Sequence, residues 1–545
     1  MIDFGAVCAQ AQKHPERIYI IDDSSNFSIS SHLGTNMTLR LAAQTKKLPP
    51  NLILLYGLIK NRMCPDLQLS FLVNAPANWL EALEIGAELS YSRIAYPTQM
   101  MYEWLFADLM SFPFPGESLA RPIMSDDELQ SRKGLDLPLS PLLQSIKQDP
   151  VFAPKVIDVE ALQEDNLLLR MDYGEFETQI PRPLAKGLIK GFFEDEAVAG
   201  AGQQHLADIV TDRIAAYMRH TRHVEVDPRR ISLAQGVFPV FGAIIAAFRH
   251  KLGRAPRVAL PDGSYGPLYP MLRYFGAELL PIATASDRAY SSSSKDLVFE
   301  PGKVPDILWL TQPGNPSGIF LDPERLRTII DTCVKQKIYV FSDEIFFLLS
   351  DHRLGKWTPA ALSAGAFCNS PEYSPYLFVA DGASKAFAAG GLRVGFVVSP
   401  DQIWAQSISR HLILPPRATL RACDNLYSAF LKKSPNPMLD VHALFAEVEE
   451  YLIDKRKLLS GHREALQALL ERHDLHDRID TPYRGGLFMM ARLDDRADDL
   501  AIDQHLLINK PQWSRTPGLA RLCYCLRQDR FKQALERLER YLDGK

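Results

Sequence analysis

The sequence lacks long hydrophobic runs, a strong net charge and an abundance of cysteine. No apolar stretch approaches the roughly 18 residues needed to span a bilayer, and Asp3 lies where a signal peptide would carry basic residues. The formal net charge of -4 gives no electrostatic reason to expect nucleic acid or a membrane surface as a partner. Seven cysteines, with no histidine cluster beside Cys523 and Cys525, fit a reducing compartment without a metal site. We therefore expect a cytoplasmic protein.

The length and composition predict a globular protein of several domains. The chain has 545 residues, of which 46% are hydrophobic and 23% charged, and one ordinary core does not extend over so many residues. We predict an N-terminal accessory domain with a linker at residues 1–160. A large domain follows at 161–410, with an N-terminal arm at 161–200, and a small C-terminal domain occupies 411–545.

The N-terminal region has the pattern of a small α/β unit. Short apolar runs predict strands and amphipathic stretches predict helices. The strands are expected at 17–22, 52–59 and 67–73, and the helices at 38–46 and 77–89. The aromatic-rich stretch at 91–112 is typical of core or of a subunit interface. Residues 113–154, with repeated prolines, predict a long irregular connector.

The charge of this region weighs against binding to DNA. Residues 1–150 contain 12 Lys and Arg against 16 Asp and Glu, which is the wrong sign for contact with phosphates. No basic recognition helix stands out either. A regulator that combines a DNA-binding domain with an enzyme-like domain remains an alternative.

The chemistry is concentrated around one lysine. Residues 378–398 read FVADGASKAFAAGGLRVGFVV, with Lys385 between two apolar runs and Arg393 eight residues later. A buried ammonium group usually has a partner or a covalent role. A desolvated lysine can attack a carbonyl as a Schiff-base nucleophile, and a nearby arginine can hold a phosphate.

Three motifs resemble the class I/II aminotransferases, which are fold-type I enzymes that use pyridoxal 5′-phosphate (PLP). Residues 384–395 resemble the lysine signature SKxxxxxGxRxG, 312–318 (QPGNPSG) resemble NPxNPTG, and 343–346 (DEIF) resemble DExY. The resemblance implies that Lys385 forms the internal aldimine. It also implies that Asn315 binds the cofactor ring oxygen and that Asp343 keeps the pyridine nitrogen protonated.

The resemblance extends to the rest of the cofactor site. It implies that Ser384 and Arg393 bind the cofactor. The predicted strand, glycine turn and helix at 230–248 place Gly236 and Val237 where a helix N-terminus would hold the phosphate. Tyr265 is the expected ring stacked on the cofactor, and Tyr269 is the second candidate.

The C-terminal motifs imply the substrate site. Residues 484–490 (RGGLFMM) resemble the GGFF strand, and 518–525 (GLARLCYC) resemble the strand whose arginine binds the substrate carboxylate. Arg521 takes that role, with Arg527 as the alternative. Gly174 is expected near the same carboxylate, and Asn315 is expected to contact the substrate as well.

The chain departs from the family at three places. Phe346 stands where the family usually has a tyrosine, and Gly382 stands where it often has a phosphate-binding serine. Residues 197–202 (AVAGAG) lack a tyrosine that in the family reaches the neighbouring subunit. The first two departures put the reaction in question more than the cofactor, because the protein selects which bond of the substrate is broken. The contact to the neighbouring subunit is either absent or made by another residue.

The expected fold is therefore α/β. A mainly parallel sheet is covered by helices, joined by a small C-terminal α+β domain and an extra N-terminal α/β domain. The expected activity is PLP-dependent transfer of an amino group between an amino acid and a 2-oxo acid, in amino acid metabolism. A PLP-dependent decarboxylase, lyase or synthase is the first alternative, and a non-catalytic regulator is the second. We expect a homodimer or a higher oligomer.

Overall fold

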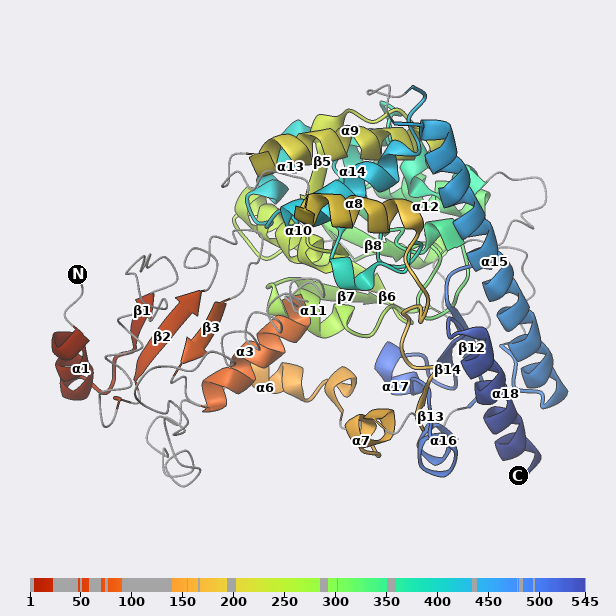
Figure 1. Cartoon of the computed structure of the whole chain (residues 1–545), viewed down its shortest axis with the longest axis horizontal. Coiled ribbons are helices and arrows are strands. Elements are labelled where there is room, and N and C mark those ends of the chain that lie inside the picture. Colours follow the sequence, from red (N-terminus) through yellow and green to blue (C-terminus); the bar gives the residue numbers. More distant parts are fainter. Residues whose placement is uncertain are drawn as a thin grey trace. The chain divides into compact units, whose positions relative to one another are not determined.

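The computed structural model divides the chain into two compact units, which are described separately (Figure 1). Unit 1 comprises residues 1–147 and 197–200, and unit 2 comprises 148–196 and 201–545. The structure describes residues 4–22, 48–49, 51–57, 70–73, 77–90, 140–153, 155–164, 167–193, 202–284, 293–300, 302–349, 359–433, 439–477, 479, 484–493 and 496–544. The expected helix at 38–46, the aromatic stretch at 91–112 and most of 113–154 and 197–202 lie outside these residues.

Unit 1 contains a three-stranded sheet and flanking helices. β1 (Tyr19–Asp22) runs parallel to β2 (Leu52–Gly57), which pairs antiparallel with β3 (Ser70–Val73). The helices are α1 (Phe4–Lys13), α3 (Ala77–Ser90) and α6 (Pro141–Lys147). Buried Asn51 donates to the carbonyl oxygens of Ala11, His14 and Arg17, which joins the end of α1 to the start of the sheet. The expected strands and the helix at 77–89 are confirmed as elements.

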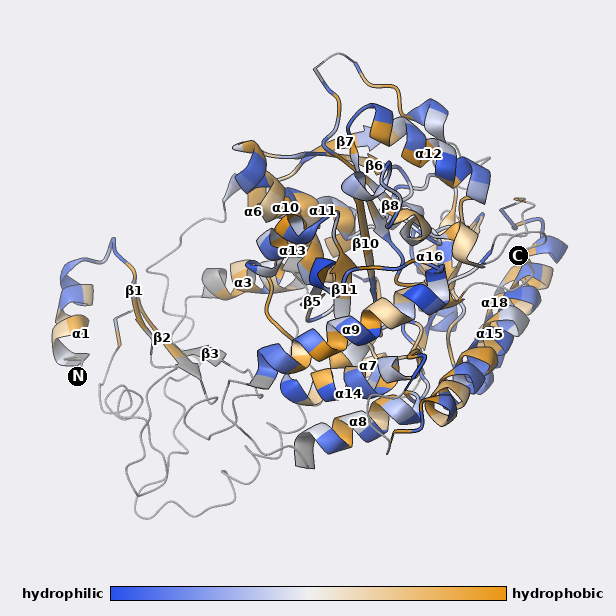
Figure 2. Cartoon of the chain, turned by 90° about the horizontal axis from the view of Figure 1, so that it is seen from above, coloured by the Kyte–Doolittle hydropathy of each residue, from blue (hydrophilic) through white to orange (hydrophobic). Residues whose placement is uncertain are grey.

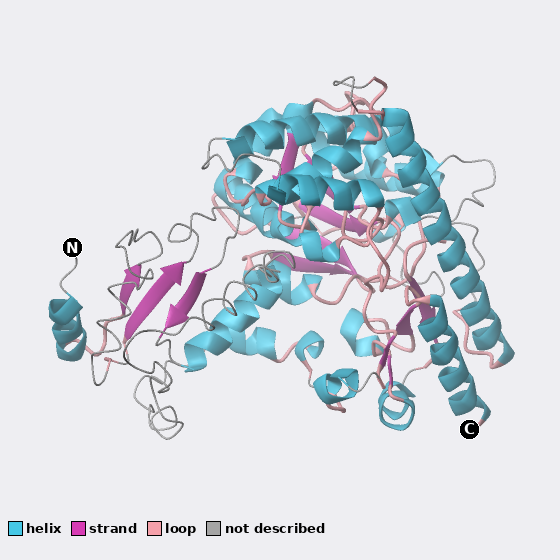
Figure 3. Cartoon of the chain, viewed as in Figure 1, coloured by secondary structure: helices cyan, strands magenta, loops and turns pink. Residues whose placement is uncertain are grey.

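A seven-stranded sheet forms the centre of unit 2 (Figure 3). Its spatial order is β5-β11-β10-β9-β8-β6-β7, and β11 is antiparallel to both of its neighbours, whereas the other pairs are parallel. The strands are β5 (Ile231–Ala234), β6 (Arg257–Pro261), β7 (Glu278–Ile282), β8 (Ile307–Thr311), β9 (Tyr339–Asp343), β10 (Leu377–Gly382) and β11 (Gly395–Val398). β5, β10 and β11 are buried along their whole length, as near-continuous apolar strands covered on both faces should be.

Helices cover this sheet in two groups, which Figure 2 shows on either side of the strands. One group contains α8 (Arg182–Phe193), α9 (Gly202–Arg222) and α14 (Arg417–Ser428), which pack on one another. The other contains α10 (Val237–Leu252), α11 (Leu268–Tyr274) and α13 (Gln402–Ser409). α12 (Pro323–Lys335) packs against β9. The predicted mainly parallel α/β fold is confirmed.

The C-terminal part of unit 2 combines helices with two small sheets. β12 (Phe488–Ala491) pairs antiparallel with β14 (Ala520–Cys523), and β13 (Leu506–Leu507) pairs parallel with β4 (Leu169–Arg170). The helices of this part are α7 (Val159–Glu164), α15 (Val441–Arg472), α16 (Arg496–Gln504), α17 (Pro511–Ser514) and α18 (Gln528–Asp543). The β13–β4 pair therefore ties the segment that precedes α8 to the C-terminal strands. No described helix combines the length and apolar character required to cross a membrane.

Candidate active site

Lys385 lies in the turn that follows β10, beside a segment more than 200 residues earlier in the chain. Its Nζ donates to the carbonyl oxygen of Gly174 at 2.8 Å and lies 3.6 Å from Oε1 of Glu175. Gly174, expected near the substrate, thus lies next to the lysine. Sequence reasoning missed Glu175, whose only signal was its place directly after Gly174. A Cβ on Gly174 would meet the Phe488 ring at 2.8 Å, so a glycine fits this close contact.

Asp343 ends β9 at the edge of the parallel sheet, where cofactors bind in α/β proteins. Its Oδ1 accepts a hydrogen bond from the backbone N–H of Ile345 at 3.2 Å. Burial raises the pKa of Asp343 to about 7, and the neighbouring carboxylates of Asp381 and Glu344 act in the same direction. Such a carboxyl is stabilised in its charged form by a cation placed beside it.

A buried ionic network lies next to Asp343, and sequence reasoning missed it. Arg222, at the end of α9, is fully buried and donates to Glu344 at 2.9 Å and to Asp381 at 2.7 Å. The hydroxyl of Tyr217 also donates to Asp381, at 2.8 Å. The network ties α9 to the ends of β9 and β10. The partners are 122 and 159 residues apart in sequence, so no local pattern could have revealed them.

Arg521 in β14 is buried in a set of hydrogen bonds that joins four parts of unit 2. Nη1 donates to Oδ1 of Asn315 at 2.8 Å, and Nη2 donates to the carbonyl oxygen of Asp172 at 2.7 Å. Nε and Nη2 both donate to Oδ1 of Asn509, at 3.0 and 2.6 Å. These bonds use four of the five N–H groups of a guanidinium, which leaves one on Nη1. The structure thus brings the predicted pair Arg521 and Asn315 together.

Aromatic rings enclose the Arg521 guanidinium. Its Cζ lies 4.5 Å from the centre of the Phe488 ring and 4.2 Å from that of Trp513 in α17. Tyr265 packs edge-to-face on Trp513, with ring centres 5.3 Å apart. Tyr269, the second stacking candidate, is 1% exposed and donates to the carbonyl of Pro261. The ring of Tyr269 is therefore part of the core, and Tyr265 is the tyrosine beside this cluster. The stacking of either ring on the cofactor stays a prediction.

A turn of backbone lies directly against Arg393, at the place where the sequence predicts a phosphate site. Gly236 caps the N-terminus of α10 with a φ of 95°, and a Cβ on it would lie 2.7 Å from Nη2 of Arg393. Val237 begins the helix, whose first N–H groups lack helical partners. A Cβ on Gly395 would lie 2.5 Å from the carbonyl carbon of Gly236, so β11 presses against the same turn. Ser384, next to Lys385, is partly buried.

The structure shows the surroundings of Gly382 and Phe346, which depart from the family pattern, and of Arg527, the alternative to Arg521. A Cβ on Gly382 would lie 2.5 Å from the backbone oxygen of Val394, so the strand pairing leaves no room for a serine there. Phe346 is buried and packs edge-to-face on Phe488. Arg527, the alternative to Arg521, is 56% exposed and pairs with Asp529 at the surface. We correct that alternative, because a surface guanidinium already paired with a carboxylate is poorly suited to bind a substrate.

The sequence profile described as "Aminotransferase class I and II" matches residues 169–538. The chain belongs to this family. Its cofactor is PLP, and the geometry fits that group: Arg393 and the Gly236 turn form a basic cradle for a phosphate, and Asp343 offers a carboxyl with a raised pKa to a ring nitrogen. The family match begins after the region that we predicted to be accessory.

The chain is also similar to individual proteins. It is 22% identical over 574 residues to methionine S-methyltransferase from Wollastonia biflora, covering 98% of this chain and 49% of that protein. It is 22% identical to a probable aspartate/prephenate aminotransferase from Aquifex aeolicus, covering 61% of this chain and 80% of that protein. An aminotransferase structure from Mycobacterium tuberculosis superposes with a TM-score of 0.58 at 18% identity, covering 71% of this chain and 94% of that chain.

The chain spans about half the length of the methionine S-methyltransferases that it matches. Those matches cover 96–98% of this chain, so they must include most of the first 168 residues. The aminotransferase family model does not include those residues. The similarity to these proteins therefore extends over both the N-terminal region and the region that the family model matches.

Proposed function

We propose that this chain is a PLP-dependent aminotransferase that moves an amino group from an amino acid to a 2-oxo acid. One observation carries the proposal. Nη2 of Arg521 donates to the carbonyl of Asp172 and Nζ of Lys385 donates to the carbonyl of Gly174. Two residues of chain span at most about 7 Å, so both side chains are held on the same short segment. A group that binds carboxylates and a group that reacts with carbonyls can then both reach the head group of one amino acid.

In this proposal Arg393, Ser384 and the turn at Gly236 and Val237 hold the cofactor phosphate through charge and backbone N–H groups. When bound, PLP supplies an aldehyde that reacts with amines and a ring that accepts electrons from the bond broken at the α-carbon. Tyr265 packs on the face of the ring.

The remaining groups act on the ring and the substrate. The carboxylate of Asp343 keeps the ring nitrogen protonated, because an ion pair there favours both charged forms. Asn315 contacts the ring oxygen and orients Arg521, which binds the α-carboxylate. Gly174 leaves space beside that carboxylate. Lys385 would act as the general acid–base group, with its Nζ accepting the proton of the substrate α-carbon and donating it to the aldehyde carbon of the cofactor.

A second candidate is a PLP-dependent decarboxylase, lyase or synthase that uses the same residues. Buried Phe346 favours this candidate, because it removes a hydroxyl that family members usually place beside the ring and so alters the electronics of the site. The long match to methionine S-methyltransferases makes methionine the first amino acid to test in either case. A non-catalytic regulator is the remaining alternative.

The test is a transfer assay with ¹⁵N-labelled amino acids, methionine and aspartate first, and a panel of 2-oxo acids. Aminotransferase activity moves the label to the 2-oxo acid, whereas a lyase or decarboxylase releases labelled ammonia or CO₂ instead. An Arg521→Lys variant is the matched control, since it keeps the charge but loses the planar fork that binds carboxylates. No conversion of any amino acid by the PLP-loaded protein would contradict both catalytic candidates.

We also propose the assembly and the domain limits as testable statements. The domains are 1–160, 161–410 and 411–545, and the chain forms a homodimer or a higher oligomer. Analytical ultracentrifugation should give a mass of at least twice the 61.3 kDa of one chain. A monomer at micromolar concentration would contradict the oligomer.

A further inference from the structure

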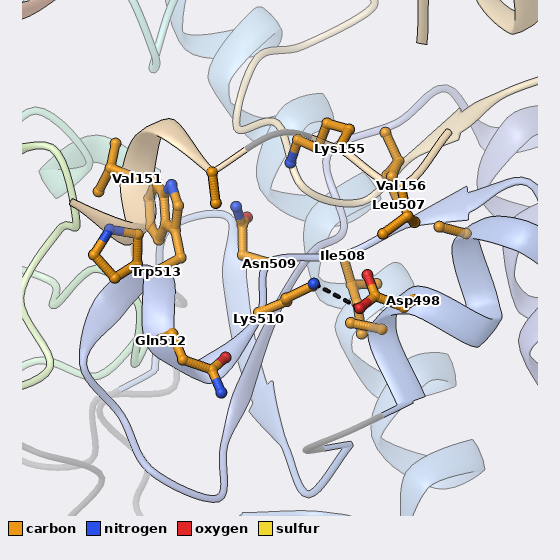
Figure 4. A pocket seen from close by; sticks show the side chains of 14 residues that line it. Val151, Lys155, Val156, Asp498, Leu507, Ile508, Asn509, Lys510, Gln512 and Trp513 are labelled. Carbon is orange, nitrogen blue, oxygen red and sulfur yellow. Dashed lines mark hydrogen bonds and ion pairs between the residues drawn. The ribbon is translucent and has the colours of Figure 1, made fainter. Parts of the chain in front are cut away.

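A cavity of about 480 Å³ lies in unit 2 next to the site described above (Figure 4). Its walls come from the 3₁₀ helix η1 (Pro150–Phe152) and the residues after it, from α16, and from the stretch between β13 and α17. The volume is in the range of small-molecule sites. Apolar side chains such as Val151, Val156 and Leu507 line much of it.

Two of the lining residues also hold Arg521. Asn509 lines the cavity, and its Oδ1 accepts two N–H bonds from the guanidinium. Trp513 lines the cavity as well, and its ring lies 4.2 Å from the guanidinium carbon. The cavity and the carboxylate-binding arginine therefore share a wall.

The other end of the Asn509 amide is available to a ligand. Asn509 is 4% exposed, and within the described part of the chain its amide nitrogen has no hydrogen-bond partner. In the view of Figure 4 its side chain extends between those of Trp513 and Lys155. This nitrogen is not among the fully buried side-chain atoms without a partner in the described residues, so it is accessible from the cavity that Asn509 lines, where an acceptor atom of a ligand can bond to it.

The charges around the cavity favour an anion. The ammonium group of Lys155 lies 3.4 Å from Asp172, a carboxylate that already accepts two bonds from Arg170 at 2.8 and 3.0 Å. Lys510 is held closely by Asp498 at 2.6 Å. Lys155 is therefore the more weakly paired cation at the cavity, and it is partly exposed to solvent.

We propose that this cavity is a second binding site for a small carboxylate with an apolar body, coupled to Arg521 through Asn509 and Trp513. The carboxylate accepts from the Asn509 amide and pairs with Lys155, and the apolar body lies along Val151 and its neighbours. Asn509 and Trp513 line the cavity and also contact Arg521, so a ligand in the cavity acts on the position of Arg521. The coupling is reciprocal, because each ligand changes the affinity for the other by the same factor. The coupling rests on the proposed role of Arg521 in binding the substrate carboxylate.

The test is calorimetric titration of the PLP-loaded full chain with 4-methylpentanoate, which has no amine and cannot be converted. We expect two equivalents per chain. Ala153→Trp, at an exposed position that lines the cavity, fills the space and should leave one equivalent. Val298→Trp, at a residue that is 84% exposed, is the matched control and should keep two. One equivalent in the unmodified chain, or two in Ala153→Trp, overturns the proposal.

Three further measurements sharpen the result. Val151→Trp fills the cavity from another side and covers the case in which Ala153→Trp does not fold. In Ala153→Trp, 4-methylpentanoate should bind at the Arg521 site with an affinity that differs by at least about fivefold from its affinity for that site in the unmodified chain with the cavity occupied. An unchanged affinity overturns the coupling. Asp498 lines the cavity, and its carboxylate can pair with the ammonium group of an amino acid but not with a keto group. If the natural ligand is an amino acid, Asp498→Asn should lower the affinity for leucine but not that for 4-methyl-2-oxopentanoate. Equal effects on the two affinities point to the 2-oxo acid.

Because these titrations need no turnover, the cavity proposal and the proposed function fail separately. A chain that binds two carboxylates but transfers no amino group would contradict the function alone. A chain that transfers amino groups but binds one carboxylate would contradict the cavity site alone.

Discussion

Replacing Asp343 by asparagine should stabilise the cofactor-free protein at high pH and weaken the binding of the cofactor. Burial raises the pKa of Asp343 to about 7, from roughly 3.9 in an unfolded chain. Each unit of difference corresponds to about 1.4 kcal/mol. Since the folded pKa is raised, the folded state binds the proton between these two values while the unfolded state does not. Stability is therefore lost as the pH rises from about 4 to about 7.

The ionisation of Asp343 lowers the free energy of unfolding of the cofactor-free protein by about 1.5 kcal/mol at pH 5 and by about 4 kcal/mol at pH 8. Asp343→Asn removes the ionisation, so its advantage in the free energy of unfolding should grow by about 2 to 3 kcal/mol between these pH values. Urea denaturation at pH 5 and pH 8 measures the difference, with the surface variant Asp529→Asn as control.

The sign should reverse when PLP is bound. A protonated ring nitrogen stabilises the charged carboxylate of Asp343, so the asparagine variant should lose cofactor affinity and become the less stable of the two proteins. An advantage of Asp343→Asn that does not change with pH, or a cofactor-free wild type that is the more stable at pH 8, would refute the reasoning.

Three other substitutions test separate parts of the site. Arg521→Lys should raise KM for amino acids by about one to two orders of magnitude, the loss of one or two charged hydrogen bonds, with the absorbance of bound cofactor unchanged; an unchanged KM would remove Arg521 from the site. Gly236→Ala should lower PLP affinity because its Cβ would lie 2.7 Å from Arg393, whereas Gly253→Ala, also at positive φ but with nothing within 4 Å, should affect stability only; equal PLP affinities would contradict the cradle. Phe346→Tyr should tighten PLP binding by about 2- to 12-fold, because the new hydroxyl gains one hydrogen bond. Equilibrium titration with PLP, followed by fluorescence, measures this affinity, and weaker binding would contradict the prediction.

The fold was predictable where local pattern and tertiary packing agree. β8 and β9 are continuous apolar runs, and their loops carry the motifs with Asn315 and Asp343 at the expected strand ends. α9 ends at Arg222, and its last turn places this arginine between the buried carboxylates of Glu344 and Asp381. The periodicity of a helix does not reveal such a pairing with distant strands.

The candidate site was predictable to the extent that its residues belong to linear motifs. Lys385, Arg393 and Arg521 follow from motif spacing. Asn509 and Trp513 belong to no motif, and they are visible only because β14 brings Arg521 beside the segment that precedes it. A single asparagine or tryptophan outside any motif carries no local sign of a role, so neither residue could be singled out before the strands were placed.

The most direct test of the central claim is the absorbance spectrum of the purified protein with PLP, before and after addition of amino acids. The account predicts a visible band that Lys385→Ala abolishes, and conversion of that band to the aminated form of the cofactor by at least one amino acid. A 2-oxo acid should then restore the original band. A protein without such a band, or one that consumes amino acids without ever forming the aminated cofactor, would contradict the assignment as an aminotransferase.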